Sequence, residues 1–130
     1  MRKIIFCGKT EDGDWIFGDL LSPDGVADGY YIMEDKPSIA KVIPDTVGQY
    51  TGLTDKNGKK IFEGDIVRFD YIGENMGVEG MATVIFQNGQ FGVLWGWHKE
   101  FVPLTGFCNT TIEVIGNIYD NPELLRSGIE

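Results

Sequence analysis

The chain has 130 residues, of which 42% are hydrophobic and 24% charged, as expected for one compact domain or two very small ones. This composition excludes a multi-domain machine and a disordered chain. Twenty acidic residues against eleven lysines and arginines give a net charge of −9. The electrostatic field of the protein therefore repels phosphate and disfavours nucleic acid as a partner.

The start of the chain does not resemble an export signal. Its basic residues and four apolar residues lead directly into Gly8, whereas a secretory signal needs roughly 7–15 apolar residues. No apolar run approaches the roughly 20 residues that span a bilayer. Cys7, Cys108 and the single histidine form no metal-ligand pattern, so we expect free buried thiols and neither a metal nor a cofactor. These features predict a cytoplasmic protein without membrane contact.

Residues 1–50 are expected to form an N-terminal β meander. Asp12-Gly13 is a hairpin dipeptide, because glycine supplies the positive φ that a tight turn requires. Pro23 and Gly25 predict a second turn, and Pro44 prevents extension of the strand before it. The expected strands are 4–8, 15–21, 30–34, 39–43 and 47–50.

Residues 51–63 are predicted to be an ordered connector with a hairpin of its own at Asn57-Gly58. Strand patterns then resume over 64–120, where five short strands fit a small SH3-like barrel. Asn88-Gly89 marks a type I′ turn between the second and third of them. The expected strands are 65–70, 81–87, 90–95, 100–105 and 111–118.

The last segment, 121–130, is predicted to be a short helix with a tail. Asn121 is a typical N-cap, Pro122 suits the first helical position, and Glu123 places an acid in the first turn. The fold class is therefore mostly β: two small antiparallel units, the second an SH3-like barrel, and a short C-terminal helix. Residues 8–20 also resemble residues 52–66, which indicates either a duplication or the recurrence of similar turn chemistry.

The tentative binding residues are aromatic and basic. Trp95 and Trp97 can form a stacking platform for a ligand, or fill the core of a small barrel. His98, with Glu100 two residues away, is the one candidate for a general base, although no nucleophile accompanies it. The basic cluster of Lys56, Lys59 and Lys60 surrounds a turn, where a solvated hairpin tip is the simpler interpretation.

Three segments together identify a resemblance. Residues 47–67, VGQYTGLTDKNGKKIFEGDIV, resemble the central signature of the YopX proteins of bacteriophages and prophages, and residues 113–125, EVIGNIYDNPELL, resemble that family's C-terminal signature. The start of the chain, residues 1–4 followed by residues 15–20, is similar to the family's looser N-terminal region. The resemblance implies a small, mostly β phage or prophage protein, and it implies no activity. The signature residues are turn and cap residues that specify a fold, or alternatively a shared surface: Gly52, Asn57, Gly58, Gly64, Asp65, Gly116, Asn117, Asn121 and Pro122.

These observations favour a non-enzymatic accessory protein that acts by protein–protein contact, either through self-association or by binding a host or phage protein. One alternative is an SH3-like nucleic-acid-binding module that stacks bases on Trp95 and Trp97 and uses the lysine cluster together with Arg68. The other alternative is a small enzyme built on His98 and Glu100.

Overall fold

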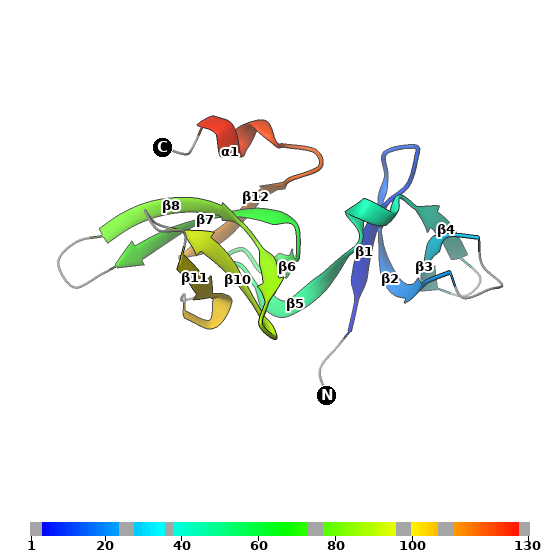
Figure 1. The fold of residues 1–130 in the computed structure, drawn as a ribbon, viewed down its shortest axis with the longest axis horizontal. Coiled ribbons are helices and arrows are strands. Elements are labelled where there is room, and N and C mark those ends of the chain that lie inside the picture. The colour runs from blue at the N-terminus through cyan, green and yellow to red at the C-terminus, as the bar shows by residue number, and fades with distance from the viewer. Residues whose placement is uncertain are drawn as a thin grey trace. The chain divides into compact units, whose positions relative to one another are not determined.

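The computed structural model describes residues 4–23, 28–35, 38–72, 77–95, 100–106 and 111–127. The chain divides into two compact units, Met1–Gly52 and Leu53–Glu130. The described elements are short antiparallel strands, two 3₁₀ turns and one helix (Figure 1). The mostly β fold class is thus confirmed.

The strands of the first unit form one antiparallel sheet in the order β4-β3-β2-β1-β5, and β5 continues into the second unit, where β6 (Lys60–Phe62) is its neighbour in the sheet. The expected hairpin at Asp12-Gly13 joins β1 to β2, and Gly13 has a φ of +94°. A 3₁₀ turn, η1 (Pro44–Thr46), follows β4, as the proline at its start allows. The strands are β1 (Phe6–Lys9), β2 (Trp15–Leu21), β3 (Tyr30–Asp35), β4 (Ser38–Val42) and β5 (Gly48–Thr54).

This sheet curls so that β4 approaches β1. The backbone N–H of Ile43 donates to the Lys9 carbonyl at 2.8 Å, and a Cβ on Gly8 would lie 2.9 Å from the Val42 side chain. Ile32 and Val42 are buried on the concave inner face, where the absence of a side chain on Gly8 leaves room for Val42. The other face of β2, β3 and β4 is therefore the outer one.

The second unit contains two three-stranded sheets, β12-β7-β8 and β11-β10-β9. Val84 separates β8 from β9, and its N–H donates to the Asp65 carbonyl while its own carbonyl accepts from Gly64. The described pairings thus give two small antiparallel sheets, and they do not show the closed SH3-like barrel that the sequence predicts. The elements are β6 (Lys60–Phe62), β7 (Asp65–Ile72), β8 (Gly77–Thr83), β9 (Ile85–Gln87), β10 (Gln90–Trp95), β11 (Glu100–Pro103), η2 (Leu104–Gly106), β12 (Ile112–Asn117) and α1 (Glu123–Ser127).

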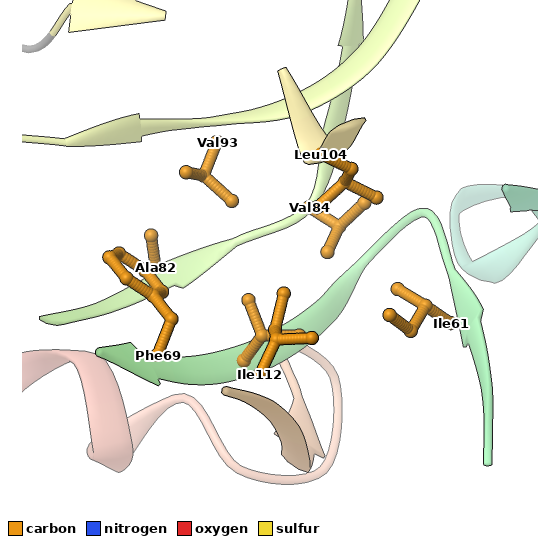
Figure 2. Close-up of a cluster of buried hydrophobic side chains, with 8 residues drawn as sticks. Ile61, Phe69, Ala82, Val84, Val93, Leu104 and Ile112 are labelled. Atoms are coloured by element: carbon orange, nitrogen blue, oxygen red, sulfur yellow. The ribbon is translucent and has the colours of Figure 1, made fainter. Parts of the chain in front are cut away.

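The core of the second unit lies between these two sheets. Figure 2 shows Val93 and Leu104 projecting towards the side chains of Phe69 and Ile112. Val93 and Phe69 are at most 1% exposed, so this core excludes water. The buried cluster consists of Ile61, Val67, Phe69, Ala82, Val84, Val93, Leu104 and Ile112.

The similarity between residues 8–20 and residues 52–66 corresponds to one turn geometry that occurs twice. Thr10 N donates to Asp14 O and Gly13 N donates to Thr10 O; in the second hairpin, Asp55, Gly58 and Lys59 form the same bonds. The similarity ends after the turn, because β2 continues as a seven-residue strand whereas β6 stops at Phe62. The recurring feature in the described structure is therefore the turn, as turn chemistry alone would produce.

Candidate functional sites

The two signature segments meet at the start of β7. In the antiparallel pair, Asp65 lies opposite Asn117 and Ile66 lies opposite Gly116. Gly64 has a φ of +96°, its carbonyl accepts the N–H of Ile118 at 3.0 Å, and a Cβ there would lie 3.3 Å from the Tyr119 ring. Glycine suits this position because it tolerates the positive φ and leaves room for the tyrosine ring.

The residues around the end of β12 lock a tight turn. The Asn117 side-chain oxygen accepts from the N–H groups of Tyr119 and Asp120 at 3.0 and 2.9 Å. The Asn121 side-chain oxygen in turn accepts from Asn117 N at 3.2 Å, and a Cβ on Gly116 would lie 2.6 Å from that oxygen. These contacts fix the path of the backbone between β12 and α1.

The expected C-terminal helix is present. It spans Glu123–Ser127, with Pro122 immediately before it, and the N–H of Leu125 donates to the Pro122 carbonyl at 3.3 Å. Gly52 lies within β5 and has a φ of +90°, which L side chains rarely adopt. Asn57 and Gly58 form the tip of the β5–β6 hairpin, where Gly58 has a φ of +81°.

Asp55 is a buried carboxylate that the sequence analysis did not single out. Its Oδ1 accepts from Asn57 N and Lys59 N, and its Oδ2 accepts from Val114 N on β12, each at 2.9 Å. Burial alone would raise the pKa of Asp55, but these backbone hydrogen bonds outweigh burial and lower the pKa below its ordinary value. Asp55 thus attaches the hairpin to the edge of β12.

Asp65 is perturbed in the opposite direction. Its Oδ2 accepts a single backbone bond, from Phe62 N at 2.8 Å. Burial raises the pKa of Asp65 to about 6, and the nearby Asp55 carboxylate adds to the rise, against the hydrogen bond and the charge of Lys59. Asp65 is therefore a signature residue whose ionised form destabilises the fold at neutral pH.

Of the aromatic candidates, Trp95 is described and is half-buried. Its ring packs edge-on against Phe69 with centroids 5.5 Å apart, and a Cβ on Gly80 would lie 2.5 Å from its Nε1. Trp95 therefore packs against the core of the second unit. Trp97 and His98 lie outside the described residues, as does Cys108; Glu100 is exposed and Cys7 is buried.

The structure separates the lysine cluster into different environments. Lys56 and Arg68 both contact Glu113, with Nζ–Oε1 and Nη2–Oε1 distances of 3.6 and 2.7 Å. The hydrogen bond from Arg68, together with the charge of Lys56, lowers the pKa of Glu113. Lys59 and Lys60 are exposed near the hairpin tip. A carboxylate thus contacts Lys56 and Arg68, two of the four cations on which the nucleic-acid alternative depends.

The sequence patterns also did not lead us to predict the outer face of the first unit. On β2, alternate residues Phe17, Asp19 and Leu21 share this face, and the register with β3 and β4 adds four more residues. Phe17, Leu21 and Ile39 are 45%, 37% and 50% exposed. We define the outer face by its residues: Phe17, Asp19, Leu21, Tyr31, Met33, Ile39 and Lys41.

A sequence signal for this face exists in the segment 15–21, WIFGDLL. A strand with one solvated face alternates apolar and polar residues, whereas here both alternating sets are mostly apolar. Ile16 and Leu20 supply the inner face, so Trp15, Phe17 and Leu21 are more apolar than a solvated face requires. Such a pattern predicts that the outer face of this sheet is also covered, by another segment or another molecule.

Of the two charged residues on the outer face, Lys41 and Asp19, the lysine is paired with a carboxylate. Lys41 Nζ lies 3.5 Å from Asp28 Oδ2, and the Tyr31 hydroxyl donates to Asp28 Oδ1 at 2.6 Å. The Tyr31 hydrogen bond, followed by the charge of Lys41, lowers the pKa of Asp28 and keeps it ionised, while the bond to Asp28 raises the pKa of Tyr31. The lysine of this face therefore already has a counter-ion, whereas Asp19 is exposed.

Within the described ranges, no group of three or more histidine, cysteine or carboxylate side chains is arranged to hold a metal ion. Over the same residues, no helix has the length and apolar character needed to cross a bilayer.

Comparisons with known proteins agree with the signature segments. The sequence profile of a family described as YopX protein matches residues 11–126. The crystal structure of protein EF1440 from Enterococcus faecalis is similar, with a TM-score of 0.60 and 27% sequence identity, over 96% of this chain and 99% of that chain. No curated protein matches the chain significantly.

Proposed function

We propose, since the chain belongs to the YopX protein family, that it is a non-enzymatic phage or prophage accessory protein that binds a protein partner in the bacterial cytoplasm. The contact surface in this proposal is the outer face of the first unit. The partner is a protein segment that carries apolar side chains on one side and basic side chains around them. The observation that carries the proposal is the exposure of Phe17, Leu21 and Ile39 on a single sheet face.

Apolar side chains that are clustered and exposed usually mark an interaction surface, whereas scattered ones are ordinary. Ile39 lies opposite Met33 and Met33 lies opposite Asp19, so the apolar residues occupy neighbouring strands of one sheet. Methionine and aromatic residues such as Met33 and Phe17 are enriched in the centres of protein interfaces. This chemistry suits a partner that buries an apolar surface against the sheet.

The surrounding charge selects a basic partner over a second copy of this chain. In the described part of the first unit, the cations are Lys9 and Lys41, and Lys41 already pairs with Asp28. The exposed carboxylates of this unit attract a cationic segment and repel another acidic chain, so they favour a basic partner and speed its association. Among the described side chains of this unit, seven carboxylates are exposed: Glu11, Asp12, Asp14, Asp19, Asp28, Glu34 and Asp45.

Binding to defined peptides tests this proposal. A lysine-rich amphipathic helical peptide and a glutamate-rich peptide with the same apolar residues are titrated into the full-length protein and followed by fluorescence anisotropy. We expect binding of the lysine peptide alone, weakening with added salt because exposed charges are screened. The double variant Phe17→Ser/Ile39→Ser should weaken binding by about tenfold or more.

Phe86→Ser is the matched control, since Phe86 is 52% exposed but belongs to the second unit. This variant should bind the lysine peptide as the wild type does. Equal binding of both peptides, or no effect of the double variant, would exclude the outer face. Light scattering that shows a dimer broken by Phe17→Ser/Ile39→Ser would identify a second copy as the occupant, and salt-sensitive binding of single-stranded DNA lost on Lys56→Ala/Arg68→Ala would favour the nucleic-acid alternative.

A further inference from the structure

The sequence contains two Asn-Gly pairs, Asn57-Gly58 and Asn88-Gly89, and both form exposed hairpin tips. Asn-Gly is the dipeptide in which an asparagine side chain is most easily attacked by the next backbone nitrogen, because glycine adds no steric hindrance. The two pairs share this sequence and this exposure. Their surroundings differ, and the difference predicts which pair reacts.

The Asn57-Gly58 pair is held in place by Asp55. Gly58 N, which would be the attacking atom, donates to the Asp55 carbonyl at 3.0 Å, and Asn57 N donates to the Asp55 carboxylate at 2.9 Å. Attack requires Gly58 N to lose its proton beside a carboxylate that is ionised at neutral pH. A hydrogen bond that must break and a neighbouring negative charge both oppose this loss.

The Asn88-Gly89 pair has neither restraint. Among the described residues, no hydrogen bond is formed by Gly89 N or by the Asn88 side chain, and the flanking residues Gln87 and Gln90 are uncharged. Asn88 also has a φ of +53°, a conformation that non-glycine residues rarely adopt. The turn lies at the end of β9 and β10, where local opening costs the least free energy.

We propose that Asn88 is a site of spontaneous deamidation and isomerisation in the folded protein, and that Asn57 is protected from it. Gly89 N loses its proton to solvent and forms a bond to Cγ of Asn88. The bond from Cγ to Nδ2 breaks, ammonia leaves, and a five-membered succinimide remains. Water then opens the ring at either carbonyl, giving aspartate or isoaspartate without any oxidation or reduction.

The two products affect the hairpin differently. Aspartate adds a negative charge and keeps the backbone length, and it tolerates the positive φ almost as well as asparagine. Isoaspartate lengthens the backbone of a turn that allows only two residues between β9 and β10, so it disturbs their register. Gln87 and Gln90 are the cross-strand pair next to the turn, and the following pair is Phe86 and Phe91, whose rings lie edge-on with centroids 4.8 Å apart.

Peptide mapping by mass spectrometry tests the proposal. The full chain is incubated at mildly alkaline pH in ¹⁸O-labelled water, and the peptides containing Asn57 and Asn88 are quantified over time. Each conversion adds about one dalton beyond the label, and isoaspartate is resolved from aspartate by its elution. We expect Asn88 to convert about tenfold faster than Asn57, the effect of one hydrogen bond and one adjacent charge.

Incubation in denaturant is the matched control, because unfolding removes the structural difference while both Asn-Gly pairs remain. The two rates should then be similar. Equal rates in the folded protein, or faster conversion of Asn57, would overturn the proposal. So would conversion of Asn88 that occurs in denaturant and not in the folded state. An Asn88→Gln variant, which forms the corresponding ring slowly, should lose the modification at this turn while Asn57 is unchanged.

Discussion

Replacing Asp55 with alanine removes the acceptor of three backbone N–H groups in one step. Val114 N is partly buried at the edge of β12, so leaving it without a partner costs about 1–3 kcal/mol. The N–H groups of Asn57 and Lys59 lie in a turn that water can reach, so each contributes about 0.5–1 kcal/mol. We therefore expect Asp55→Ala to lower the free energy of unfolding of the second unit by about 2–5 kcal/mol.

Urea denaturation measures this loss when the fluorescence signal comes from the second unit alone. A Trp15→Phe background achieves this, since the remaining tryptophans, Trp95 and Trp97, both belong to Leu53–Glu130. Hydrogen exchange of the Val114 amide provides a local measure of the same bond. Because the pKa of Asp55 is lowered in the fold, its contribution is complete above the unfolded pKa and is lost as pH falls through the folded value.

Thr10→Ala is the matched control. Because Thr10 belongs to the first unit, its effect is followed by Trp15 fluorescence in a Trp95→Phe/Trp97→Phe background. Thr10 occupies the equivalent place in the first hairpin, but its hydroxyl accepts only Asp14 N, at 3.2 Å and exposed to solvent. Its loss should cost about 0.5–1 kcal/mol. If Asp55→Ala costs no more than Thr10→Ala, or if exchange at Val114 is unchanged, the inference that Asp55 joins the hairpin to β12 is wrong.

Three further predictions concern the second unit. Asp65→Asn should raise the free energy of unfolding at pH 7 by about 1–3 kcal/mol, because the raised pKa of Asp65 gives stability at low pH that is lost as pH rises through about 6. The urea denaturation curves of the variant and the wild type should therefore differ at pH 7 and lie closer together at pH 4. Gly80→Ala should cost about 1–3 kcal/mol and shift the tryptophan emission, since its Cβ would overlap Trp95 and Phe69. Glu113→Gln should leave thermal stability nearly unchanged, because its ion pairs are partly exposed and screened by solvent.

Local chemistry made most strands predictable. Asp12-Gly13, Asn57-Gly58 and Asn88-Gly89 each lie at a hairpin turn, because the need for a positive φ is a property of the dipeptide itself. The beginning of β8 at Gly77 was missed, since its glycines have low strand propensity and are accommodated by packing. Gly80, beneath Trp95 and Phe69, is an example of this accommodation.

The candidate sites were less predictable, because they depend on contacts between distant residues. Asp55 looks like an ordinary turn residue until Val114, 59 positions later, is placed beside it. Whether Trp95 belongs to the core or to a ligand platform depended on Phe69 from another strand. The outer face was in principle readable from the apolar residues of 15–21, but its extent needed the register of three strands.

The bond from Val114 to Asp55 has a consequence for association between chains. β12 pairs with β7 on one side only, so its other side would offer unpaired backbone groups to any strand of another molecule. Asp55 accepts the Val114 N–H there, and Lys56 N donates to the Ile112 carbonyl at 2.9 Å. An incoming strand would have to displace the ionised Asp55 side chain and break its hydrogen bonds. The hairpin thus occupies this edge of the sheet, and Asp55→Ala should increase fibril formation, measured by thioflavin T fluorescence, as well as unfolding.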